Sequence, residues 1–190
     1  AADQLGFPIF PLTWTDPQNG EVAVGYKEAG YLPEALINFL AFLGWNPGTT
    51  QEIFSMDELI QAFSVDRISK AGAKFDIQKA QWFNQHYLRS KSNEELAALL
   101  FEFLKKENID CTPENALKIA ATMRDRITFP KDLWEQGKFF FLAPTTFDEN
   151  VVSKKWNDDA VKVLSAYATE IAALNAFDAT VAKTTLEKVT

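Results

Sequence analysis

Residues 30–47 read Gly30-Tyr-Leu-Pro-Glu-Ala-Leu-Ile-Asn-Phe-Leu-Ala-Phe-Leu-Gly-Trp-Asn-Pro47, and they predict a helix with its own start and stop. Pro33 suits a first helical turn, because the N–H that proline lacks would be unpaired there, and Gly44 ends the helix. Apolar side chains recur round the whole cylinder, so we expect a helix buried on most sides, with Leu40 in the core. The run is well short of the roughly 20 apolar residues that span a bilayer.

Two capped helices are predicted after this segment. Ser55 and Glu58 have the spacing of a capping box, which predicts a helix over residues 56–63. Asp76 is an N-cap residue in front of a second helix over residues 77–89. Both caps use local sequence alone, so they fix where these helices begin.

The segment 6–25 indicates a short extended pair of strands. Its turn signal is Asn19-Gly20, and prolines at positions 8 and 11 restrict any pairing to a loose hairpin or an edge. We expect little other strand in the chain.

A break at Ser90–Asn93 predicts a domain boundary, with one domain over residues 1–91 and another over 92–190. Beyond the break, Ser92 and Glu95 form a second capping box, and the chain reads as helical almost throughout. The predicted fold class is therefore mainly α. A helical domain that opens with an extended segment precedes a helical bundle.

Composition excludes several kinds of site. The chain has one cysteine, Cys111, and one histidine, His86, so neither an internal disulfide nor a Cys/His metal cluster can form. No phosphate-binding loop or nucleophile motif occurs, so we predict no catalytic residue, no metal site and no cofactor in this chain. By elimination the chain is a binding module, and a reducing cytoplasm fits its cysteine content.

Positive charge is concentrated in one part of an acidic chain. The net charge is −7, and residues 1–66 contain Lys27 as their single basic residue, yet residues 67–91 contain six basic residues and one acidic residue. A solvated helical face explains such a run, and contact with nucleic-acid phosphates is the other interpretation. The candidates for backbone contact are Lys70, Lys74, Lys79, Arg89 and Lys91.

A second basic feature, Arg124 and Arg126 beside Phe129, is expected at a helix end and an exposed loop. Arginine forms bidentate hydrogen bonds and stacks on unpaired bases, which suits recognition of RNA loops. Surface ion pairs within the chain are the alternative. Their acidic partners would be Asp125, Asp132 and Glu114.

The chain resembles bacterial glutamyl-tRNA synthetases downstream of their catalytic domain. The resemblance rests on residues 30–47, on Glu52–Phe63 with its Ser and Glu-Leu, and on Lys74–Leu88 with its Phe-Asp, Lys, Trp, Asn and Tyr in order. It continues through Arg124–Trp134 and Phe139–Phe141. The match therefore covers most of the chain.

The resemblance implies a role in binding tRNA. Residues 1–91 would form a stem-contact domain along the inside of the L-shaped tRNA, and the part from about Asn93 would begin a helical anticodon-binding domain. Either Arg124 or Arg126 would read the anticodon. The implied partner is tRNA(Glu), with no DNA and no membrane.

The resemblance also implies what this chain lacks. The intact parent ligates glutamate to tRNA(Glu) with ATP and Mg²⁺, and those sites are expected outside this fragment, which would be inactive alone. We expect a cytoplasmic monomer. The alternative function is a helical protein–protein adaptor without an RNA ligand.

Overall fold

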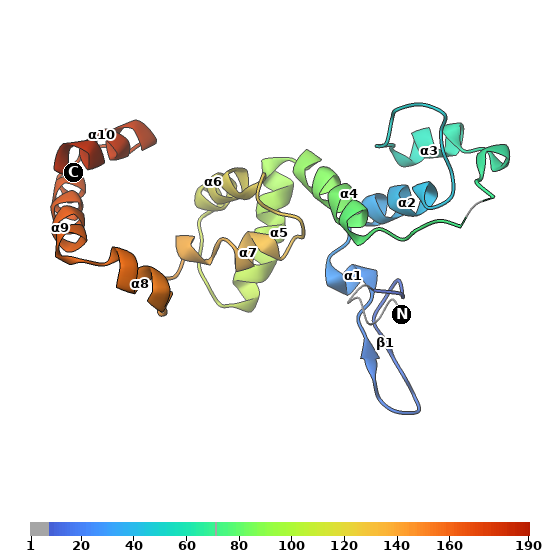
Figure 1. Cartoon of the computed structure of the whole chain (residues 1–190), viewed down its shortest axis with the longest axis horizontal. Coiled ribbons are helices and arrows are strands. Elements are labelled where there is room, and N and C mark those ends of the chain that lie inside the picture. The colour runs from blue at the N-terminus through green and yellow to red at the C-terminus, as the bar shows by residue number, and fades with distance from the viewer. Residues whose placement is uncertain (1–7, 71) are drawn as a thin grey trace. The chain divides into compact units, whose positions relative to one another are not determined.

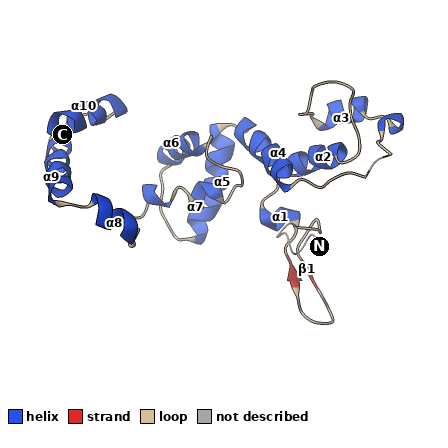
Figure 2. Ribbon diagram, viewed as in Figure 1, coloured by secondary structure: helices blue, strands red, loops and turns tan. Residues whose placement is uncertain are grey.

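A computed structural model describes residues 8–70 and 72–190 of the chain (Figures 1 and 2). Helices make up most of this part, and one two-stranded sheet accompanies them. The mainly helical fold predicted from the sequence is confirmed. The chain divides into two compact units, Ala1–Leu142 and Ala143–Thr190.

The hairpin near the N-terminus consists of β1 (Trp14–Thr15) and β2 (Val22–Ala23), which pair antiparallel as predicted. Trp14 lies opposite Ala23 in this register. Gly20 in the connecting turn has a φ of 75°. Glycine adopts positive φ without the steric cost of a Cβ, which explains why the predicted turn forms there.

The central helix begins where the sequence predicts but is less buried than expected. α1 (Tyr26–Ala29) leads into α2 (Pro33–Phe42), whose inner face buries Asn38 and Phe39. The expectation of burial on most sides, with Leu40 in the core, is wrong, because Leu40 is 44% exposed. An apolar pattern that runs all round a helix does not identify which face the chain covers.

α3 (Met56–Ala62) begins at the predicted capping box. Ser55 Oγ accepts the N–H of Glu58 at 3.3 Å, and the Glu58 carboxylate accepts the N–H of Ser55 at 2.7 Å. A short 3-10 turn, η2 (Val65–Arg67), follows α3. The two reciprocal bonds satisfy N–H groups that a helix start leaves unpaired.

α4 (Ile77–Ser90) packs against α2, and the two helices meet near the centre of the first unit (Figure 1). The predicted N-cap is confirmed, since the Asp76 side chain accepts the N–H of Lys79 at 3.1 Å. Phe83 of α4 is fully buried in the same cluster as Phe39 of α2. This packing holds α4 in place, and Leu88 near the end of α4 packs into the next core.

The next core is built from α5 (Asn93–Lys106), α6 (Pro113–Met123), α7 (Asp132–Glu135) and the 3-10 turn η3 (Lys138–Phe140). α5 starts at the predicted capping box on Ser92, and its apolar stripe packs against α6 and α7. The large buried side chains of this core are Leu88, Leu96, Leu100, Leu104, Ile119, Met123, Ile127, Leu133 and Trp134.

The second unit contains α8 (Glu149–Lys155), α9 (Asp158–Ala172) and α10 (Ala179–Val189). α9 and α10 pack on each other, and Tyr167 of α9 donates its hydroxyl hydrogen to the Ala182 carbonyl at 3.1 Å. α9 and α10 therefore form a helical pair within this unit.

Two other expectations bear on the fold. The domain boundary predicted between residues 91 and 92 stays a prediction. No helix in the described part of the chain has the length and apolar character needed to cross a membrane.

Candidate nucleic-acid interface

The two arginines after α6 have different surroundings, although one residue separates them. Arg124 is half-buried and turned inward. Its Nη1 donates to the Arg89 carbonyl at 2.9 Å, and its Nη2 donates to the Asn93 side-chain oxygen. Arg124 therefore joins the end of α4 to the start of α5, and its guanidinium is already engaged by hydrogen bonds within the protein.

Arg126 is exposed, and its backbone N–H donates to the Met123 carbonyl at 2.9 Å. Among residues 8–70 and 72–190, no hydrogen bond or ion pair engages its guanidinium. The expected alternative of surface ion pairs does not hold for either arginine, since Arg124 bonds to a carbonyl and an amide. Of the two, Arg126 presents its full set of donors to solvent.

Phe129 is not the exposed loop residue expected from the sequence. It is half-buried, and its ring meets Tyr31 edge-on, with 5.0 Å between centroids and 83° between planes. Burial of this pair raises the pKa of Tyr31 to about 12, with a smaller contribution from the nearby Tyr26. Phe129 therefore belongs to the packed wall behind the loop.

The loop after Arg126 is held by buried polar side chains. Asp132, at the start of α7, accepts the N–H groups of Thr128 and Phe129 at 2.7 and 2.8 Å on one oxygen. Asn84 of α4 donates to the Thr128 carbonyl at 2.6 Å. The backbone just beyond Arg126 is thus fixed on both sides.

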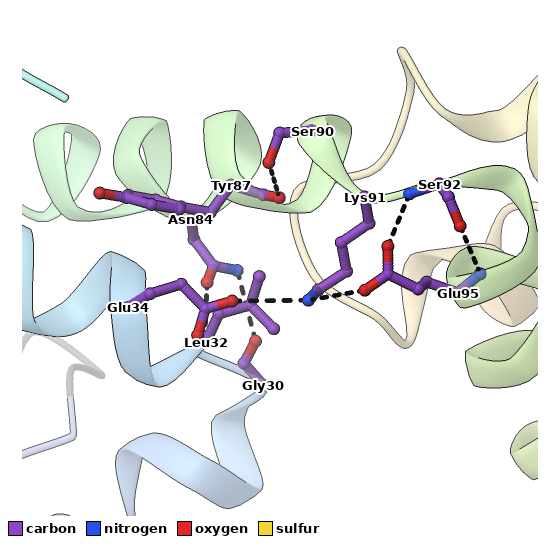
Figure 3. A network of polar contacts seen from close by, with 9 residues as sticks. All are labelled: Gly30, Leu32, Glu34, Asn84, Tyr87, Ser90, Lys91, Ser92 and Glu95. Atoms are coloured by element: carbon purple, nitrogen blue, oxygen red, sulfur yellow. Dashed lines mark hydrogen bonds and ion pairs between the residues drawn. The ribbon is translucent and has the colours of Figure 1, made fainter. Parts of the chain in front are cut away.

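Asn84 also reaches the start of α2. Its Oδ1 accepts the N–H of Leu32 at 2.7 Å, and its Nδ2 donates to the Gly30 carbonyl at 3.3 Å (Figure 3). The sequence pattern predicts no role for Asn84, and it suggests Asp132 only as a surface partner for arginine. A signal was present for Asn84, because an amide on the apolar face of a helix must find partners when it is buried.

Lys70 and Lys74 are exposed on the segment that precedes α4. Neither ammonium has a hydrogen bond or ion pair with any residue that the structure describes. Both charges are therefore available to a ligand from solution.

The other basic candidates already have partners within the fold. Lys79 pairs with Glu52 at 2.7 Å, and its ammonium lies 4.2 Å from the centroid of the Trp82 ring. Arg89 donates to the Asp125 carbonyl. These side chains therefore serve the fold itself, whereas Lys70 and Lys74 have no partner among the described residues.

Lys91 pairs with two carboxylates from different helices. Its ammonium is 3.4 Å from Glu34 of α2 and 3.9 Å from Glu95 of α5 (Figure 3). Half-buried and paired on both sides, Lys91 connects these two helices at the point where α4 ends.

Two family models match the chain. One described as an anticodon binding domain matches residues 89–190, and one described as the catalytic domain of class I tRNA synthetases (E and Q) matches residues 21–82. The chain is 51% identical to the glutamate–tRNA ligase of Phocaeicola vulgatus over 92% of its length. The chain belongs to the glutamyl-tRNA synthetase family.

Other members of the glutamyl-tRNA synthetase family give the same result. The glutamate–tRNA ligase of Cytophaga hutchinsonii is 55% identical over 90% of this chain. The crystal structure of a glutamate–tRNA ligase from Elizabethkingia meningosepticum, in complex with its amino acid, superimposes with a TM-score of 0.92 at 42% identity, covering 99% of this chain. The chain spans 33 to 37% of the length of these relatives.

The candidate residues divide between the two matches to the glutamyl-tRNA synthetase family. Arg124 and Arg126 lie within the anticodon-binding match, and Lys70 and Lys74 lie within the other match. Among the described residues, no group of three or more His, Cys, Asp or Glu side chains is placed to hold a metal ion.

Proposed function

We propose that this chain is the tRNA-binding part of a glutamyl-tRNA synthetase. Residues 1–91 contact the stem of tRNA(Glu), and residues 92–190 bind its anticodon. The observation that carries this proposal is the unpaired guanidinium of Arg126, placed at the end of α6 inside the anticodon-binding match. The intact enzyme is a cytoplasmic monomer that joins glutamate to tRNA(Glu) with ATP and Mg²⁺, held outside this chain.

Arg126 reads an anticodon base in this proposal. An arginine fork donates two parallel hydrogen bonds to a base edge, and its planar group stacks on a base that has left its helix. Arg124 cannot do this without breaking its bonds to Arg89 and Asn93. Phe129 supports the loop from behind through its contact with Tyr31.

Lys70 and Lys74 supply the main contacts to the phosphate backbone. A free ammonium gains a phosphate and releases a counterion, whereas Lys79 would first have to leave Glu52. We therefore assign supporting contacts to Lys79, Arg89 and Lys91, each of which adds less binding free energy because it must first leave a partner in the protein.

Titration of labelled tRNA(Glu) with the chain tests the proposal, with a second transcript that differs only in its anticodon. Arg126→Gln should reduce the preference for the matching anticodon by about 1–3 kcal/mol, or roughly 5- to 150-fold, as for other bidentate base contacts. Lys118→Gln on α6, the helix that precedes Arg126, is the control, because Lys118 pairs with Glu114 and its loss should leave the preference unchanged.

Salt separates backbone contacts from base contacts. Lys74→Ala should weaken binding of both transcripts alike and reduce the slope of log affinity against log salt by about one unit. A chain that ignores tRNA at every salt concentration would instead be the adaptor considered from the sequence. If the unmodified chain bound the two transcripts with equal affinity, the proposal that Arg126 reads the anticodon would be contradicted.

A further inference from the structure

Both backbone groups of Thr128 are bound by side chains that the fold has buried. Its N–H donates to Asp132, which is 8% exposed, and its carbonyl accepts from Asn84, which is 0% exposed. A third contact, from Gln85 Nε2 to Thr128 Oγ1, is long at 3.5 Å. Thr128 is thus held from two directions.

Burying two polar side chains to hold one loop residue is costly. Each must be removed from water, and the cost is offset only when all its hydrogen bonds are made. Asn84 makes three bonds and the bound oxygen of Asp132 accepts two. These bonds fix the Thr128 backbone, and those of Asn84 also fix Gly30 and Leu32.

Arg126 is therefore fixed on both sides along the chain. On its N-terminal side, its own N–H bonds to Met123, and Arg124 is anchored to Arg89. On its C-terminal side, Ile127 is fully buried and Thr128 is held as described. The backbone of Arg126 is set by its neighbours, while its side chain remains free to reach a ligand.

We propose that Asn84 and Asp132 are positioning residues for anticodon reading, which hold the Arg126 backbone where its guanidinium meets the base. This inference rests on the proposed function. Asn84 belongs to α4 and also binds Gly30 and Leu32 at the start of α2, so it ties the base-reading loop to the stem-contact part (Figure 3). Neither side chain touches RNA in this proposal.

Asn84→Asp is the first test. The new carboxylate still accepts the Leu32 N–H, but it loses the donor for Thr128 and Gly30 and sets an oxygen against their carbonyls. Misplacing a group in an active site by about 1 Å can cost on the order of 100-fold in rate, and we expect base reading to be similarly sensitive, with anticodon preference falling at least about tenfold. The measurement is the ratio of dissociation constants for the matching and altered transcripts.

Asn38→Asp is a matched control for this substitution. Asn38 is also 0% exposed and on the packed face of its helix, and its Nδ2 donates to the Glu52 carbonyl at 3.1 Å. Its Oδ1 accepts the N–H of Phe54 at 2.8 Å. The same atoms change in both variants, but Asn38 does not bind the loop after Arg126, so its variant should keep the preference within about twofold of the wild type.

Substitutions of Asp132 test the loop from its other side. They decide whether the positioning role holds if Asn84→Asp does not fold. Asp132→Ala leaves the N–H groups of Thr128 and Phe129 without their acceptor, and we expect the same loss of preference. Asp132→Asn retains an oxygen at that position and should restore it. A residue with a merely structural role would lower stability without changing the ratio of the two dissociation constants.

Failure of the positioning role and failure of the proposed function give different results in these experiments. Loss of preference in Asn84→Asp and Asp132→Ala, with retention in Asn38→Asp and Asp132→Asn, supports the positioning role. A wild type that prefers the matching anticodon, with folded Asn84 and Asp132 variants that prefer it equally, overturns the positioning role alone. A wild type without any preference overturns both.

Discussion

α2 and α5 are both rich in apolar side chains, yet the chain covers them differently. On α5, Leu96, Leu100 and Leu104 are at most 1% exposed, and charged residues occupy the opposite face. On α2, Phe39 is buried but its neighbour Leu40 is 44% exposed. One of these helices therefore has a single dry face, and the other leaves apolar side chains in water.

The difference shows what charged residues contribute to a helix. The polar side of α5 identifies the face that meets solvent, and the apolar stripe must then face the core. α2 has no such marker on its outer side. There Ile37 and Ala41 line a hollow of about 380 Å³ together with residues of α3.

The largest effect is expected at the inner face of α2. Phe39→Ala removes a ring that packs on Phe75 and Phe83 at centroid distances of 5.1 and 6.2 Å. Loss of a buried phenylalanine costs about 3–5 kcal/mol in the free energy of unfolding. Urea unfolding followed by circular dichroism measures it, and an unchanged midpoint would show that this face of α2 is not core.

Leu100→Ala on α5 should cost about 2–5 kcal/mol, because the side chain is fully buried and the neighbours relax only partly into the cavity. Glu102→Ala on the exposed face of the same helix is the control, expected within about 0.5 kcal/mol of wild type. Similar losses for the two variants would contradict the assignment of the dry face.

Leu40→Ala should cost less than about 1 kcal/mol, since nearly half of the side chain already meets water. The same urea experiment measures this loss beside that of Phe39→Ala. If Leu40→Ala were as damaging as the neighbouring substitution, another surface would have to cover this face in solution.

The smallest effect is expected where the two helices are linked by charge. Lys91→Gln removes the pairs with Glu34 of α2 and Glu95 of α5 and should cost about 0.2–1 kcal/mol at low salt. The loss should shrink in high salt, where exposed charges are screened. A loss that is independent of salt would mean that Lys91 acts through packing of its stem.

Local features of the fold could be predicted from the sequence. The caps at Ser55, Asp76 and Ser92 depend on residues at most three positions away, and each forms as predicted. The hairpin turn depends on one glycine. These elements needed no knowledge of distant segments, so pattern alone was sufficient.

The candidate site depends on contacts between distant residues, which a single sequence does not reveal. Arg124 is occupied by Arg89 and Asn93, which are 35 and 31 residues away. Asn84 meets Thr128 across 44 residues. Whether an arginine is free, or an asparagine holds a loop, is decided by packing that brings these segments together.

The connection between α4 and α5 has a mechanical consequence. Only Lys91 and Ser92 separate the two helices, and both are tied down, the first by two carboxylates and the second by its capping box (Figure 3). A connection of two residues leaves the backbone little freedom, so tilting α5 against α4 would break those bonds. If the proposed function holds, this connection sets a fixed distance between the part that contacts the tRNA stem and the part that contacts the anticodon. Binding would then depend on the spacing of these two features of the tRNA as well as on their sequences.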